Sequence, residues 1–155
     1  MRERPAFAKH PYSYRDDPAV PKFPDDRPLF IFDGVCVLCS SGVRWLAMRD
    51  RDGRFRFATA QSSVGRAIYA HYGIDMDETY LLLDEGQLYG KSDGYLRVAA
   101  ILGGFWRAPG GLARIIPRAL RDAAYDIVAR HRYRWFGKTE YCGLIPPELK
   151  ERLLD

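Results

Sequence analysis

The sequence predicts one α/β domain whose strands and helices follow the order β-α-β-α-β-β-α. Its 155 residues are 47% apolar and 14% aromatic, a content that suits one sizeable core better than two domains. Short apolar runs alternate along the chain with segments in which apolar residues recur at helical spacing. We therefore expect residues 28–155 to form a single domain, with a helical extension from about residue 112 to the C-terminus.

Residues 1–27 are expected to form an extended N-terminal arm. Six of the ten prolines lie within the first 28 residues, and each proline removes a backbone donor and holds the chain extended. The arm either packs on the domain through Tyr12, Tyr14 and Phe23 or stays mobile, and the sequence leaves both alternatives open.

The ordered part of the chain begins at residues 29–33 (LFIFD). This short apolar run ends in Asp-Gly, which predicts a buried strand followed by a tight loop. The period then changes, because Cys39, Val43 and Leu46 recur on one face of a helix. The predicted order is strand, loop, Cys-x-x-Cys and helix.

The middle of the chain predicts a second strand and helix, then a hairpin and a third helix. Residues 54–60 alternate with the period of a strand, and residues 62–73 have helical spacing and end in glycine. Two short apolar runs joined at Glu85-Gly86 are typical of a hairpin. Ser92 is a suitable N-cap for a helix that ends at about Leu102.

A last amphipathic helix is predicted after a loop rich in glycine, proline and aromatic residues (103–111). Pro117 fits near the start of this helix, where a missing N–H costs little. The apolar face is expected to pack on the α/β domain, with the charged residues on the opposite face. The apolar face consists of Ile116, Leu120, Ala124, Ile127 and Val128, and the opposite face of Arg118, Asp122 and Asp126.

Two of the three cysteines, Cys36 and Cys39, lie between the first strand and the first helix. The first turn of a helix favours a thiolate, because unpaired backbone N–H groups and the helix dipole place partial positive charge there. Cys36 lies at that turn, whereas Cys39 lies one turn deeper, within reach of Cys36 but better shielded. We therefore expect Cys36 to attack a substrate disulfide and Cys39 to resolve the mixed disulfide.

Asp33 at the end of the first strand has two interpretations. As a general base, its carboxylate would accept the proton of the resolving thiol of Cys39. Alternatively, an aspartate before glycine at the end of a strand often only forms the turn. The sequence leaves both roles open.

A structural zinc site is one alternative function for the cysteines. Zinc needs four ligands, so Cys36 and Cys39 would have to be joined by Cys142 and a histidine. The chain has three histidines, but no second Cys-x-x-Cys and no paired histidines that would support such a site. We therefore expect neither a metal nor another cofactor.

A binding module for acidic lipid or nucleic acid is the other alternative. Residues 130–138 (RHRYRWFGK) alternate cationic and aromatic side chains, which is a pattern that binds such surfaces. However, aromatic residues beside an apolar helix face are more often packed than displayed. We therefore expect this run to belong to the packed domain.

The overall charge and the apolar segments give no sign of a nucleic-acid-binding, secreted or membrane-spanning protein. The formal net charge of +4 is a modest surplus and does not by itself imply nucleic acid. The N-terminus lacks the apolar core of a signal peptide, and no segment approaches the ~20 apolar residues of a membrane span. We therefore expect a cytoplasmic protein with reduced thiols, and the oligomeric state stays open.

The motif FDGVCVLC resembles the Asp-x-x-Cys-x-x-Cys motif of the DCC family of predicted thiol-disulfide oxidoreductases. The resemblance extends over residues 29–146 and includes RFRFATAQS, KSDGYLRVAAILGG, the segment IIPRALRDAAYDIVARHRYRWFGK and Cys142. It implies a thioredoxin-like fold with a mixed four-stranded sheet, and a redox pair of Cys36 and Cys39 with Asp33 as the third motif residue. The implied substrate is a disulfide-containing protein or a small thiol.

The chain departs from thioredoxins and glutaredoxins at one position. Those proteins place a cis-proline before the third strand, facing the disulfide, whereas this chain has Glu78 before Thr79. A cis bond is improbable without proline. We therefore expect Glu78 and Thr79 to take the substrate-binding place, with Thr79 facing the thiols, and substrate docking to differ from that of thioredoxins.

Overall fold

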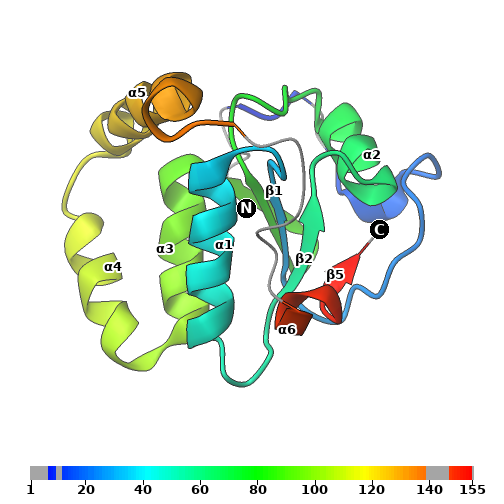
Figure 1. Cartoon of the computed structure of the whole chain (residues 1–155), viewed down its shortest axis with the longest axis horizontal. Helices are drawn as coiled ribbons and strands as arrows, with labels where there is room; N and C mark the ends of the chain where they lie inside the picture. Colours follow the sequence, from blue (N-terminus) through cyan, green and yellow to red (C-terminus); the bar gives the residue numbers. More distant parts are fainter. Residues whose placement is uncertain (1–6, 10–11, 139–146, 155) are drawn as a thin grey trace.

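The computed structural model describes residues 7–9, 12–138 and 147–154. A mixed β-sheet forms the middle layer of the fold (Figure 1). Helices α1 (Val37–Arg49) and α3 (Lys91–Leu102) cover one face of the sheet, and α2 (Ser63–Tyr72) covers the other (Figure 1). From the first strand to the third helix, the element order is the predicted β-α-β-α-β-β-α.

The sheet has five strands in the order β4-β3-β1-β2-β5. Strand β1 pairs in parallel with β2 and antiparallel with β3, and β3 pairs antiparallel with β4. The strands are β1 (Leu29–Phe32), β2 (Arg56–Thr59), β3 (Leu81–Asp84), β4 (Gln87–Gly90) and β5 (Leu153–Leu154).

The expectation of a four-stranded sheet is wrong, because β5 pairs in parallel with β2 and extends the sheet at that edge. Leu153 lies opposite Phe57 and Leu154 opposite Ala58. Two residues are too few to display the period of a strand, so only the tertiary contact with β2 identifies them.

The side chains of β1 divide the core between the two faces of the sheet. Leu29 and Ile31 pack in the cluster that includes α2, whereas Phe30 and Phe32 pack in the cluster that includes α1 and α3. All four side chains are buried. A central strand covered on both faces needs a continuous apolar run, which explains the sequence LFIF.

The hairpin between β3 and β4 follows the prediction. Glu85 and Gly86 have φ angles of 51° and 75°, and positive φ at both central positions is typical of a type I′ turn. The third helix differs from the prediction, because it begins at Lys91 and Ser92 is not its N-cap. The hydroxyl of Ser92 instead donates to Asp122 at 2.5 Å and connects α3 to the C-terminal part of the chain.

In the described part of the chain, three α-helices follow α3, namely α4 (Arg107–Ala113), α5 (Arg118–Phe136) and α6 (Pro147–Lys150). Helix α5 lies across the end of the layer formed by α1 and α3 (Figure 1). None of the helices in the described part of the chain is long and apolar enough to cross a membrane.

Helix α5 does not pack through its predicted apolar face. Ile116, just before the helix, and Leu120 and Ile127 within it are 48%, 63% and 54% exposed. The face expected to be solvated instead contacts α3: Asp126 pairs with Lys91 at 3.1 Å, Asp122 accepts from Ser92, and Arg118 pairs with Asp93. Helix α5 is thus attached to α3 through ion pairs and through the ring of Tyr125, which packs beside Tyr95, and not through the predicted apolar face.

The described residues of the N-terminal arm pack on the domain. Tyr14 begins a short 3-10 helix (Tyr14–Asp16), and its side chain is only 3% exposed. The Tyr14 ring stacks on Phe23, and its backbone N–H donates to the Tyr72 hydroxyl on α2. Tyr12 packs edge-on against His71. Residues 12–23 therefore add to the core on the α2 side of the sheet.

We predict that Asp50→Ala lowers the free energy of unfolding by about 3 kcal/mol, the cost of removing one partner of a buried ionic network. Asp50 is buried after α1, where its carboxylate accepts from the backbone N–H of Arg54 and of Phe55 and pairs with Arg152 next to β5. Urea denaturation measures the change.

Asp52→Ala is the matched control, because the Asp52 side chain is 71% exposed and forms only a surface pair with Arg54. We expect this variant to stay within about 0.5 kcal/mol of the parent. Equal losses of stability in both variants would contradict a structural role for the buried carboxylate.

Candidate active site at the start of helix α1

Cys36 is the N-cap residue of α1. Its backbone is extended, with φ −85° and ψ 120°, and its Sγ accepts the backbone N–H of Cys39 at 3.2 Å. The thiol therefore takes the place of the side-chain oxygen that usually satisfies an unpaired N–H in the first turn. Both cysteines are free thiols in this structure.

The two thiols differ in acidity. The Cys39 thiol, as a hydrogen-bond donor to Cys36, lowers the pKa of Cys36 from 9.0 to about 7 against the opposing effect of burial. The backbone N–H of Cys39 and the positive charge of Arg132 act in the same direction. The same hydrogen bond, together with burial, raises the pKa of Cys39 far above its usual value.

The accessibility of the two thiols is the reverse of the expectation. Cys36 is fully buried, whereas Cys39 is only partly buried. The reason is the chain after α5: Lys138 forms an isolated antiparallel bridge with Cys36, and the backbone N–H of Val37 donates to the carbonyl of Gly137 at 3.4 Å. The expectation that Cys39 is the better shielded thiol is therefore wrong, because a segment about 100 residues away in sequence covers Cys36.

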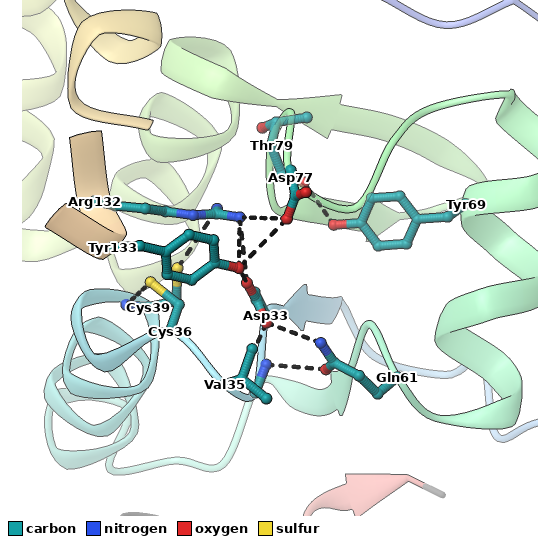
Figure 2. A network of polar contacts seen from close by, with 11 residues as sticks. Asp33, Val35, Cys36, Cys39, Gln61, Tyr69, Asp77, Thr79, Arg132 and Tyr133 are labelled. Atoms are coloured by element: carbon teal, nitrogen blue, oxygen red, sulfur yellow. Dashed lines mark hydrogen bonds and ion pairs between the residues drawn. The ribbon is translucent and has the colours of Figure 1, made fainter. Parts of the chain in front are cut away.

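Asp33 is buried, and its carboxylate accepts hydrogen bonds from four groups (Figure 2). Oδ1 accepts from the backbone N–H of Val35 at 3.1 Å and from Nε2 of Gln61 at 2.8 Å. Oδ2 accepts from Nη2 of Arg132 at 3.2 Å and from the hydroxyl of Tyr133. The bond to Val35 closes the turn after β1, and the other three connect this turn to the loop after β2 and to α5.

Arg132 connects the carboxylates of this site to the thiols. Its side chain is only 4% exposed, and Nη2 contacts Asp33 at 3.2 Å and Asp77 at 3.3 Å. Nη1 lies 3.9 Å from Sγ of Cys39. Figure 2 shows Arg132 and Tyr133 reaching from α5 toward the cysteines at the start of α1. A buried positive charge next to two thiols favours their ionised forms.

A family model, described as DCC1-like thiol-disulfide oxidoreductase, matches residues 30–138 of this chain. The match spans the whole site, from the turn after β1 to Lys138. The chain belongs to the DCC1-like family.

Two curated relatives agree with this assignment. The chain is 36% identical over 128 residues to the uncharacterized protein YuxK of Bacillus subtilis, covering 81% of this chain and 93% of the relative. It is 31% identical over 122 residues to a DCC family protein of Arabidopsis thaliana described as chloroplastic, covering 77% of this chain and 71% of the relative. No solved structure matches.

Several groups of this DCC1-like site were not predicted from the sequence, namely Gln61, Asp77, Arg132 and Tyr133. The run of residues 130–138 signalled an unusual density of cations and aromatic rings, but the sequence did not distinguish inward from outward positions. In the structure Arg132 and Tyr133 face the thiols, whereas Trp135 and Phe136 are about half exposed. The expectation that the aromatic residues of this run are packed is therefore wrong for these two rings.

Glu78 and Thr79 lie in the segment before β3. The Thr79 hydroxyl donates to the carbonyl of Tyr80 at 2.9 Å and accepts from the backbone N–H of Lys91, and Glu78 approaches Lys91 at 3.8 Å. The described residues contain no cis peptide bond. In this loop, Asp77 is the residue that contacts Arg132. The substrate-binding role of Glu78 and Thr79 stays a prediction.

The zinc alternative depends partly on residues that the structure does not describe. In residues 7–9, 12–138 and 147–154, no three side chains of histidine, cysteine, aspartate or glutamate are grouped so as to hold a metal ion. Cys142, the third cysteine of that alternative, lies outside the described residues.

We predict that Cys36 ionises with a midpoint near pH 7 in the reduced protein, because the thiolate accepts two hydrogen bonds and lies near Arg132. The ultraviolet absorbance of the thiolate, followed against pH, measures this without requiring access to the buried sulfur. Cys39→Ala should raise the midpoint, because the donor thiol is lost. A transition near pH 7 that persists in Cys36→Ser would contradict the assignment.

The same shift predicts how stability depends on pH. The folded pKa of Cys36 lies below its ordinary value of 9.0, so its ionisation stabilises the reduced fold as pH rises from about 7 to 9. This contribution is lost as pH falls through about 7. Urea denaturation should therefore show a stability difference between the parent and Cys36→Ser that grows across this interval.

Proposed function

We propose that this chain is a thiol-disulfide oxidoreductase in which Cys36 and Cys39 form the redox pair. The observation that carries the proposal is the position of Cys36 at the N-cap of α1, where its Sγ accepts the N–H of Cys39. A sulfur held there is stabilised as the thiolate, which is the nucleophilic form of cysteine. Membership of the DCC1-like family supports the same reaction class.

The proposed reaction has two steps. The thiolate of Cys36 attacks one sulfur of a substrate disulfide, a new S–S bond forms, and the other substrate sulfur leaves as a thiolate. Cys39 then loses its proton and attacks Sγ of Cys36, which releases the second substrate thiolate and leaves a Cys36–Cys39 disulfide. Two electrons pass from the protein to the substrate, and each released thiolate takes up one proton.

Access to Cys36 requires the backbone at Gly137 and Lys138 to separate from the start of α1. Among the described residues, the backbone contacts between this segment and the start of α1 are the bridge to Cys36 and one long hydrogen bond from Val37. Both are local backbone contacts at the end of α5, so a substrate backbone that pairs with Cys36 would replace them. The substrate is a protein or small-molecule disulfide, and a cytoplasmic location stays a prediction.

We assign Asp33 first to the positioning of Arg132. Four donors already engage its carboxylate, so the uptake of a proton from Cys39 would have to disturb them. As a hydrogen-bond acceptor for Arg132, Asp33 instead holds a positive charge beside Sγ of Cys39, and this charge also lowers the pKa of Cys36. Glu78 and Thr79 are proposed to border the substrate from the loop that contains Asp77.

Trapping of the mixed disulfide tests this function and the order of the cysteines. Cys39→Ser should accumulate a mixed disulfide between glutathione and Cys36 when glutathione disulfide is added, because the resolving thiol is missing. Cys36→Ser should react more slowly, because burial still raises the pKa of Cys39 in this variant and its sulfur lacks the N-cap hydrogen bond that Cys36 accepts. Mass spectrometry of acid-quenched samples measures both species.

The parent protein serves as the control and should pass directly to the Cys36–Cys39 disulfide. If Cys36→Ser forms the mixed disulfide faster than Cys39→Ser does, the order of attack is reversed. If the parent protein forms no disulfide with glutathione across a range of redox ratios, the oxidoreductase function is wrong.

Asp33→Asn separates the two roles of this carboxylate. The charge of Asp33 by itself opposes ionisation of Cys36, whereas the charge of Arg132 favours it. If Asp33 positions Arg132, Asp33→Asn should raise the pKa of Cys36, because the guanidinium loses its anchor. If Asp33 acts only as a general base, the pKa of Cys36 should fall and the resolution step should slow by about 10²-fold. The thiolate titration and stopped-flow quenching measure the two quantities.

A further inference from the structure

A cavity of about 510 Å³ lies between α1, α3, α5 and the adjoining face of the sheet, and Cys39 and Arg132 belong to its wall. Six aromatic side chains form much of the lining: Phe30, Phe32, Trp45, Tyr80, Tyr95 and Tyr125. Cavities of this size and composition are typical of sites for small apolar molecules. Trp45, Tyr95 and Val128 are also exposed at the surface and therefore mark its mouth.

Among the described residues that line the cavity, Arg132 is the one charged side chain, and its charge is already balanced. Arg132 pairs with the buried carboxylate of Asp33 and with Asp77. A ligand carboxylate would therefore add a second negative charge in an apolar site, at a cost that the single guanidinium does not offset. A neutral ligand avoids this cost.

The guanidinium of Arg132 nevertheless has unused donors. Nε is buried and has no hydrogen-bond partner among the described residues, and the contact of Nη1 with Sγ of Cys39 is long, at 3.9 Å. Buried donors are normally satisfied, so these groups favour a ligand that presents an acceptor oxygen beside Cys39. A peptide segment fits poorly, because its backbone N–H and C=O groups would find few partners among the aromatic rings.

We propose that this cavity binds a quinone, and that the quinone accepts the two electrons of the Cys36–Cys39 dithiol. A quinone is neutral and apolar, its flat ring stacks on aromatic side chains, and its carbonyl oxygens accept hydrogen bonds. This inference rests on the proposed redox function of the two cysteines and names a substrate class for it.

The overall step is balanced. The S–H bonds of Cys36 and Cys39 break and one S–S bond forms between them, which releases two electrons and two protons. The quinone takes up both electrons and both protons, and its two carbonyl oxygens become the hydroxyls of the quinol. Cys39 belongs to the wall of the cavity, so the dithiol lies next to the acceptor without a second protein.

Decylubiquinone is a suitable probe, because its ring is fully substituted and retains no hydrogen that a thiol would replace to give a stable adduct. We expect it to quench the tryptophan fluorescence of the oxidised full-length chain, where no reaction is possible, because Trp45 lines the cavity. We also expect it to oxidise the reduced chain without oxygen, with loss of quinone absorbance and of two thiols per molecule of quinone consumed.

Two variants fill the cavity, and one matched variant does not. Ala129 and Ala124 on α5 line the cavity, Ala129 as a partly buried residue and Ala124 at its exposed rim. Ala129→Phe should weaken binding about tenfold or more, equivalent to 1.4 kcal/mol, and Ala124→Phe should weaken it less. Ala123→Phe places the same side chain at an exposed position outside the lining and should bind as the parent does. Circular dichroism of each variant checks the fold.

The outcomes separate this inference from the proposed function. If glutathione disulfide oxidises the parent protein but decylubiquinone neither binds nor oxidises it, the quinone site is wrong and the oxidoreductase function stands. Binding that all three phenylalanine variants retain equally, or binding without oxidation of the reduced dithiol, also overturns the proposal. If decylubiquinone binds but no oxidant forms the Cys36–Cys39 disulfide, both the oxidoreductase function and the electron transfer are wrong.

Discussion

The buried ion pair between Arg132 and Asp33 is the interaction on which the site depends. Both side chains are almost completely excluded from water, at 4% and 3% exposure, so neither charge is tolerated there without the other. Arg132 belongs to α5 and Asp33 to the turn after β1. The pair therefore holds the C-terminal helix over the start of α1, and it also places the positive charge that both thiols experience.

The same polar attachment accompanies two unusual features of α5. Contacts of Asp122 and Asp126 with α3 fix the helix on its charged side, so Leu120 and Ile127 remain exposed. The helix also contributes Ala124 and Ala129 to the lining of the cavity, and these small side chains leave its volume open. Helix α5 is thus held by ion pairs to α3 and by the ring of Tyr125, which packs against Tyr80 and Tyr95, while Leu120 and Ile127 stay exposed.

The two cysteines differ in acidity and in accessibility, and the two differences run in opposite directions. Cys36 has the lowered pKa but is fully buried, whereas Cys39 has the raised pKa but borders the cavity. The acidity follows from the helix start, where Cys36 accepts the N–H of Cys39. The accessibility follows from the bridge to Lys138. The site therefore offers a stabilised thiolate under a backbone cover and a neutral thiol facing an apolar space.

Local sequence patterns determined the elements of the α/β core and the position of the Cys-x-x-Cys pair. These patterns act over a few residues, where apolar periodicity and backbone preference decide the secondary structure. They are the run LFIF, the glycine after α2, the Glu85-Gly86 turn and the cysteines at a helix start. Only the tertiary structure decided the face on which α5 packs, the fifth strand and the role of Arg132. Arg132 and Asp33 are 99 residues apart in sequence, and β5 is only two residues long. Such contacts form between segments that are distant in sequence, where one segment pairs the buried charges or the free backbone hydrogen-bonding groups of the other. The local periodicity of apolar residues carries no information about them.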